Sequence, residues 1–94
     1  MSTPLSIVGE LTIYRALELK PQILDAVAAQ PTPALDLSQV EEIDTAGVQL
    51  LMLAQREAQA RGAELQLLEP SAAVKDALEL LGLSPRLVDN GEPA

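Results

Sequence analysis

The residues with the most chemistry to offer stand in one stretch, residues 36–47, where carboxylates and two hydroxyls follow a short apolar run. Asp44 and Thr45 come directly before an apolar helical pattern, so either side chain can cap the helix. A helix start offers unpaired N–H groups and a partial positive charge, and the small residues Ala46 and Gly47 let a backbone or an anion come close. The stretch predicts a contact site at a helix N-terminus, with helix capping alone as the simpler interpretation.

The composition limits the chemistry that this stretch can perform. The 94-residue chain has no histidine and no cysteine, and aromatic residues make up 1% of it. Zinc sites of the usual kind, thiol nucleophiles and histidine proton relays are therefore excluded. The acidic residues Asp36, Glu41, Glu42 and Asp44 could bind a divalent cation, but a solvated loop with a capping aspartate explains them more simply. We expect no metal, no cofactor and no enzyme.

The charge of the chain favours a protein partner. Six Lys and Arg residues stand against fourteen Asp and Glu residues, which gives a net charge of −8. Nucleic acid is not expected as a partner, because both a basic footprint and aromatic stacking residues are missing. The charge also disfavours anionic membranes and favours a partner with a basic surface. Without a long apolar run or a secretory signal pattern, we expect a cytoplasmic protein that does not insert into the membrane.

The hydrophobic pattern indicates strands that alternate with helices. Gly9-Glu10 separates two strand-like runs, residues 5–8 and 11–14, and predicts a tight hairpin with Tyr14 packed at a strand end. Pro21 interrupts the helical pattern of residues 15–29, so that helix is expected to begin near residues 18–20. The remaining expected elements are a strand at 34–37, a polar connection at 38–43, a helix from 44–47 to 61, a strand at 64–68 and a helix at 72–81.

This order predicts a single α/β domain over residues 1–88, followed by a polar tail at 89–94. Ser71 is the expected N-cap of the last helix, and Gly62 and Gly82 are expected to end the second and third helices. On the second helix the apolar stripe of Gly47, Leu50, Leu51, Ala54 and Ala58 faces the core. Val48, Met52 and Leu53 fall toward the polar side, which indicates a docking patch unless a neighbouring helix covers Val48 and Met52.

The segment LDLSQVEEIDTAGVQLL resembles the core of the STAS family, named for sulphate transporters and anti-sigma factor antagonists. The family pattern is an apolar strand ending in Asp-Leu/Phe-Ser, a short spacer, and Asp-(Ser/Thr)-(Ser/Thr/Gly/Ala)-Gly-Leu at a helix start. The matching residues are Asp36, Ser38, Asp44, Thr45 and Gly47, with Val48 in place of leucine. Residues 9–12, 62–68 and 74–83 resemble the flanking elements in the same order. The resemblance implies a STAS-like α/β fold, with a small mixed sheet of about four strands and helices mainly on one face.

The resemblance also implies a function by contact. Stand-alone STAS domains bind a protein partner, often an anti-sigma factor that is a serine kinase, and phosphorylation of the Asp-Ser-Ser-Gly-like loop breaks the complex. Thr45 is then the candidate phosphoacceptor, because Ala46 fills the second hydroxyl position. Ser38 is the next hydroxyl to consider. The implied partner-binding residues are Asp44, Thr45, Ala46, Gly47, Val48, Gln49 and Met52, and the implied loop support is Asp36, Ser38, Glu41 and Glu42.

Three other interpretations remain open. STAS subunits of Mla-type phospholipid ABC transporters carry an Asp-Thr-Gly-Gly loop, which is closer to residues 44–47, and they bind the ATPase subunit. Single STAS proteins also accompany chemotaxis systems, which would make the partner a chemotaxis component. A small ligand- or nucleotide-binding domain is the third interpretation, although a Gly-x-x-x-x-Gly-Lys loop is missing.

Overall fold

In the computed structural model of the protein, which describes residues 3–84 and 86–87, short parallel strands alternate with three helices. The expected α/β class is confirmed, with five strands among these residues instead of about four. The strands are β1 (Leu5–Ser6), β2 (Gly9–Leu11), β3 (Ala34–Asp36), β4 (Val40–Ile43) and β5 (Gln66–Leu68), and the helices are α1 (Ala16–Ala29), α2 (Thr45–Ala60) and α3 (Ala72–Leu80). The polar tail expected at 89–94 lies outside the described residues.

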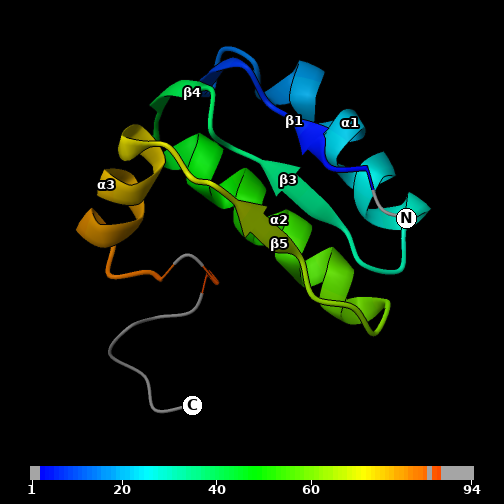
Figure 1. Cartoon of the computed structure of the whole chain (residues 1–94). Helices are drawn as coiled ribbons and strands as arrows, with labels where there is room; N and C mark the ends of the chain where they lie inside the picture. Colours follow the sequence, from blue (N-terminus) through cyan, green and yellow to red (C-terminus); the bar gives the residue numbers. More distant parts are fainter. Residues whose placement is uncertain (1–2, 85, 88–94) are drawn as a thin grey trace.

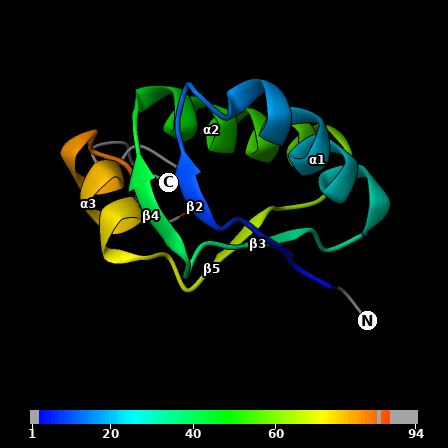
Figure 2. The same cartoon turned by 90° about the horizontal axis from the view of Figure 1, so that it is seen from above.

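The strands form two small sheets, one of three strands and one of two, with α1 and α3 at opposite ends of the molecule in Figure 1. β3 lies between β1 and β5, and β2 pairs with β4, every pair being parallel. Hydrogen bonding continues between the two groups, because the Ile7 N–H donates to the Asp36 carbonyl at 3.1 Å and the Gly9 N–H to the Gln39 carbonyl at 3.0 Å. Figure 2 shows α1 and α2 over one face and α3 beside β4. In this arrangement β4 ends and α2 begins on either side of Asp44.

The hairpin predicted at Gly9-Glu10 is wrong. Both residues belong to β2, which pairs in parallel with β4 and not with β1. Gly9 adopts a φ of +87°, so it bends one continuous edge chain instead of reversing it. Arg15 holds the bend, because its guanidinium donates to the carbonyl of Val8 at 2.6 Å and to that of Glu10 at 2.9 Å.

The polar connection expected at 38–43 is also partly wrong, because residues 40–43 form β4. Val40 is buried and Ile43 half-buried, while Glu41 and Glu42 between them are exposed. Pairing with β2 supplies the strand with backbone partners that the adjacent glutamates do not indicate. The carboxylates expected in a loop therefore lie on a strand.

Helix α1 begins earlier than Pro21 indicated, at Ala16. Pro21 removes only the bond that its N–H would donate to the Leu17 carbonyl, on the exposed face of the helix where water can replace it. Tyr14, expected to pack at a strand end, precedes the helix and is 89% exposed. The segment between β2 and α1 therefore presents a large aromatic side chain to solvent.

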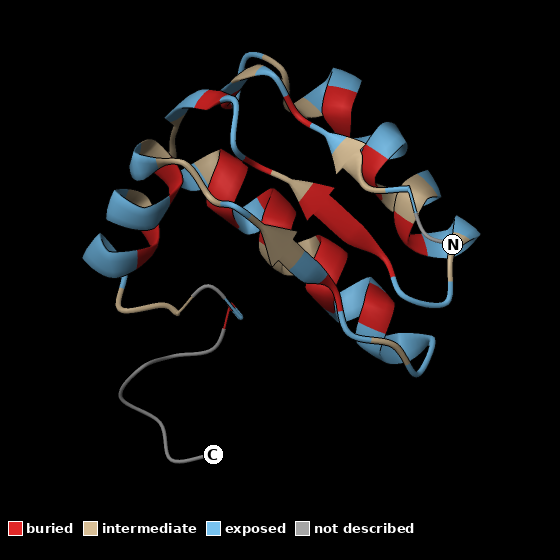
Figure 3. Ribbon diagram, in the orientation of Figure 1, coloured by how far each residue is buried: buried red, intermediate tan, exposed pale blue. Residues whose placement is uncertain are grey.

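The N-cap of α3 and the glycines that follow α2 and α3 agree with the sequence predictions. Ser71 caps α3 by accepting a hydrogen bond from the Val74 N–H at 3.3 Å, and Gly62 and Gly82 take φ values of +77° and +70° after their helices. Buried residues follow β3 and recur along the inner sides of the helices (Figure 3). The core includes Leu19, Ile23, Val27, Leu35, Leu37, Leu51, Ala54, Ala58, Val74 and Leu78. Within the described residues, each helix is too short or too polar to cross a bilayer.

Candidate functional site

Asp44 joins two segments at the start of α2. Its Oδ1 accepts a hydrogen bond from the Gly47 N–H at 2.9 Å, which is the predicted N-cap. Its Oδ2 accepts a second bond from the Ile13 N–H at 3.0 Å, in the segment that connects β2 to α1. These two bonds, the one from Ile13 first, hold the pKa of the Asp44 carboxyl below its usual value. The carboxylate thus fixes the helix start against the β2–α1 connection.

Gly47 is required by close packing and not by its backbone angles. A Cβ placed on Gly47 would lie 2.0 Å from the carbonyl oxygen of Leu11 and 2.9 Å from Cγ1 of Ile43. The first turn of α2 therefore rests directly on the end of β2, where the Asp44 N–H also reaches the Leu11 carbonyl at 3.4 Å. Because Gly47 has no side chain, the first turn of α2 can pack directly against the end of β2.

Thr45 is the first residue of α2 and its side chain is exposed. Its hydroxyl makes no hydrogen bond to any residue in the described part of the chain. Capping is already performed by Asp44, so the hydroxyl has no structural duty there. The hydroxyl is therefore accessible from outside the domain, at the N-terminus of a helix of 16 residues.

The structure separates the expected loop support into two places. The Ser38 N–H donates to Oδ1 of Asp36 at 2.9 Å, and this bond, with a second from the Ser38 hydroxyl, lowers the pKa of the Asp36 carboxyl. This turn precedes β4, whereas Asp44 follows it, so about 13 Å of strand lies between the two carboxylates. Glu42 lies opposite Glu10 of β2, so these exposed carboxylates keep one edge of the site acidic. Asp36 and Ser38 shape the chain and do not touch Thr45.

The expected partner-binding residues of α2 also divide into two groups. Gln49 is exposed and both Ala46 and Met52 are half-buried, so these three can contact a partner. Val48 is only 2% exposed and belongs to the core, which corrects its place in the docking patch. The helical period put Val48 near the polar side, but the adjoining core covers it.

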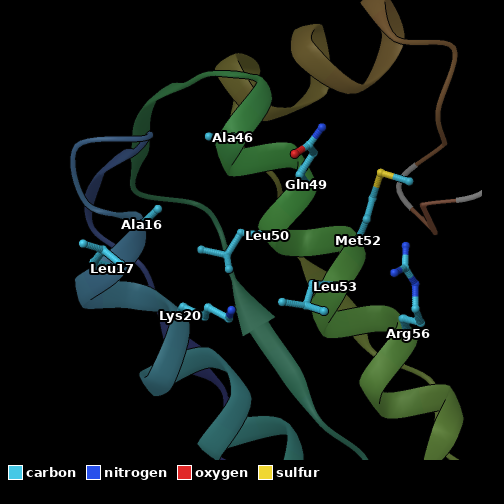
Figure 4. A pocket seen from close by; sticks show the side chains of 9 residues that line it. All are labelled: Ala16, Leu17, Lys20, Ala46, Gln49, Leu50, Met52, Leu53 and Arg56. Carbon is cyan, nitrogen blue, oxygen red and sulfur yellow. The ribbon is translucent and has the colours of Figure 1, made fainter.

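Sequence reasoning missed the contribution of α1 to this surface. A groove of about 500 Å³ runs between α1 and α2, and its lining includes Leu17 and Lys20 together with Ala46, Gln49 and Met52 (Figure 4). Leu17 is 92% exposed, which marks an apolar side chain without a partner inside the domain. The position of Leu17 beside Lys20 on a helical pattern was visible in the sequence, but the pairing of this face with α2 was not.

A family model and two solved structures match this chain. The sequence model of the family described as "Mlab, STAS domain" matches residues 2–89. A comparison with curated proteins gave no significant match. A Thermotoga maritima protein described as a "putative anti-sigma factor antagonist" is similar in structure, with 25% identity and a TM-score of 0.68 over 79% of this chain and 65% of that chain. The anti-sigma factor antagonist SpoIIAA in its unphosphorylated form shares the fold, with 23% identity and a TM-score of 0.63 over 80% of this chain and 70% of that chain.

Proposed function

The chain belongs to the STAS domain family, and we propose that it is a cytoplasmic regulatory module that binds a protein partner through the loop and helix beginning at Asp44. The structures that it resembles are described as anti-sigma factor antagonists, which regulate and do not catalyse. The partner in this proposal is an anti-sigma factor, a serine kinase or another signalling protein. The observation that carries the proposal is the free, exposed hydroxyl of Thr45 beside the hydrogen-bonded carboxylate of Asp44.

Phosphorylation of Thr45 is the proposed switch. A phosphate adds about −1.5 to −2 charge and competes for N–H groups at the helix start. Asp44 already accepts from one of those groups, the N–H of Gly47, so the two anions repel each other within one turn. Weakening of the Asp44 carboxylate contacts would also release the Ile13 N–H. The charge therefore acts on α2 and on the β2–α1 connection together.

Substitutions at Thr45 test this proposal. In affinity capture from the native cell with mass spectrometry of partner and chain, Thr45→Ala should retain the partner and Thr45→Asp should lose it. Phosphate should appear on Thr45 of the wild-type chain. Gln39→Asp is the matched control and should capture the partner like the wild type, because Gln39 is also exposed but lies at the other end of β4. If Thr45→Ala and Thr45→Asp both capture the partner like the wild type, the switch is refuted.

A second function is favoured by the name of the matched family and by the loop sequence. The family description "Mlab, STAS domain" and the Asp-Thr-Ala-Gly sequence of residues 44–47 support an accessory subunit of an Mla-type phospholipid ABC transporter. The same surface would then bind the ATPase subunit constitutively. This alternative predicts co-purification with an ATPase and no phosphate on Thr45. Recovery of only a kinase or a receptor component would exclude it.

A further inference from the structure

The groove between α1 and α2 has a charge opposite to that of the chain. Two cationic side chains, Lys20 from α1 and Arg56 from α2, line an otherwise apolar or neutral groove, and no carboxylate is among its lining residues within the described chain. Figure 4 shows Lys20 pointing from α1 toward α2, with Leu50 and Leu53 between the two helices and Arg56 at the far edge of α2. The whole chain has a net charge of −8, so the charge of this groove is opposite in sign to that of the chain.

The two cations are also unpaired within the described residues, whereas two other arginines are not. Arg15 pairs with Glu18 at 3.3 Å and Arg86 with Glu64 at 2.8 Å. Lys20 and Arg56 form no ion pair in that same part of the chain; Arg61 and Lys75 form none there either, but they lie outside the groove. Both therefore remain available to an anionic partner beside exposed apolar surface.

We propose that this groove binds an amphipathic, acidic helix of the partner. An apolar groove between two helices can bind a third, amphipathic helix. That helix inserts its apolar residues at positions i, i+3 or i+4, and i+7 into the groove. Leu17, Met52 and Leu53 supply the apolar contacts, and Lys20 and Arg56 supply the charges. Carboxylates on the partner helix complement those cations, which the net charge of the chain alone would not predict.

The inference deepens the proposed function and rests on it, because Ala46 of the groove adjoins Thr45. An acidic helix in the groove ends next to the hydroxyl, so a phosphate on Thr45 would repel it directly. The edge that carries Glu10 and Glu42 still requires a basic rim on the partner. The partner surface therefore changes sign between this edge and the groove.

Designed peptides test the charge preference. The probes are two capped amphipathic helical peptides with the same leucine stripe, one with glutamate and one with lysine on its flanks, titrated into the ¹⁵N-labelled full chain. The net charge of the chain predicts tighter binding of the lysine peptide. We expect the opposite: the glutamate peptide binds more tightly by about fivefold, with shifts concentrated at Leu17, Lys20, Leu53 and Arg56.

Charge-reversal variants locate the effect. The Lys20→Glu/Arg56→Glu variant should bind the glutamate peptide about tenfold more weakly and should prefer the lysine peptide. The matched control Arg61→Glu/Lys75→Glu makes the same change in net charge at two exposed positions outside the groove, and should bind like the wild type. The amide spectra of both variants report whether the fold is retained.

Four outcomes would overturn the inference. These are tighter binding of the lysine peptide, an equal loss in the control variant, occupation of the groove by anionic lipid vesicles in place of the peptide, and self-association through the groove in sedimentation. The native partner separates this inference from the proposed function. If Thr45→Asp abolishes capture while Lys20→Glu/Arg56→Glu does not, the proposed function stands and the acidic helix is refuted. If only Lys20→Glu/Arg56→Glu abolishes capture, the groove stands and the switch at Thr45 is refuted.

Discussion

Replacement of Asp44 tests the link between α2 and the β2–α1 connection. Asp44→Ala removes the N-cap, which contributes about 1 kcal/mol, and the bond from the Ile13 N–H. That second bond is exposed, so water replaces part of it and its loss costs about 0.5–1 kcal/mol. The free energy of unfolding should therefore fall by about 2 kcal/mol in total. For a chain of this size the melting temperature should fall by roughly 10 °C.

Asp44→Asn separates the two contributions. Asparagine caps as well as aspartate, but its amide group cannot accept from both N–H groups. The asparagine variant should therefore lose about half as much as the alanine variant, because it keeps the bond from Gly47.

Urea unfolding followed by far-ultraviolet circular dichroism measures both losses, since the single Tyr14 is too exposed to report on the core. Glu41→Ala, at an exposed carboxylate of β4, is the control and should change stability by less than about 0.5 kcal/mol. Equal losses in Asp44→Ala and Asp44→Asn, or losses no larger than the control, would refute the two-bond account.

The dependence on pH follows from the lowered pKa of Asp44. Because the carboxyl binds its proton more weakly in the folded state, its contribution to stability is complete above about pH 5 and is lost as pH falls through the folded pKa. The difference in unfolding free energy between the wild type and Asp44→Asn should therefore shrink below about pH 4. Asp36, whose pKa is also lowered, is present in both proteins, so its contribution cancels.

Two further predictions concern how α2 packs against the rest of the domain. Gly47→Ala should destabilise the domain by about 3 kcal/mol or prevent its folding, because its Cβ would overlap the Leu11 carbonyl, and the amide spectrum should change along the whole first turn of α2. Gln55, 7% exposed, accepts a hydrogen bond from the Leu65 N–H at 2.9 Å. Gln55→Leu should therefore cost about 1–3 kcal/mol in urea unfolding, while Gln59→Leu, at an exposed position of the same helix, should cost less than about 0.5 kcal/mol.

The start of α2 was predictable because local rules determine it. A capping aspartate, a hydroxyl and a glycine directly before an apolar helical pattern allow few other structures, and the structure places Asp44 and Gly47 accordingly. The same holds for Ser71 at the start of α3. The sequence did not indicate why Gly47 is a glycine, because the carbonyl that it contacts belongs to Leu11, far away in the chain.

The strands were harder to predict because pairing between distant segments decides them. Gly9-Glu10 has the local composition of a hairpin turn, yet β2 gains its hydrogen bonds from β4, about thirty residues later. The sequence did not indicate β4 either, because the adjacent Glu41 and Glu42 are both exposed and break the alternation typical of a strand. Only the parallel pairing observed in the structure shows that these residues form one edge.

Net charge does not describe the charge of the groove. Charge summed over the sequence gives every cation equal weight, but the fold pairs Arg15 and Arg86 with glutamates and leaves Lys20 and Arg56 along an apolar surface. A partner senses the charges within about a Debye length, roughly 8–10 Å, more than the total. Its affinity should therefore depend on the order of charges along α1 and α2, from the acidic start at Asp44 to the cations of the groove. A phosphate on Thr45 extends the acidic part of that order toward the groove, so one modification can oppose an acidic helix without disturbing the core.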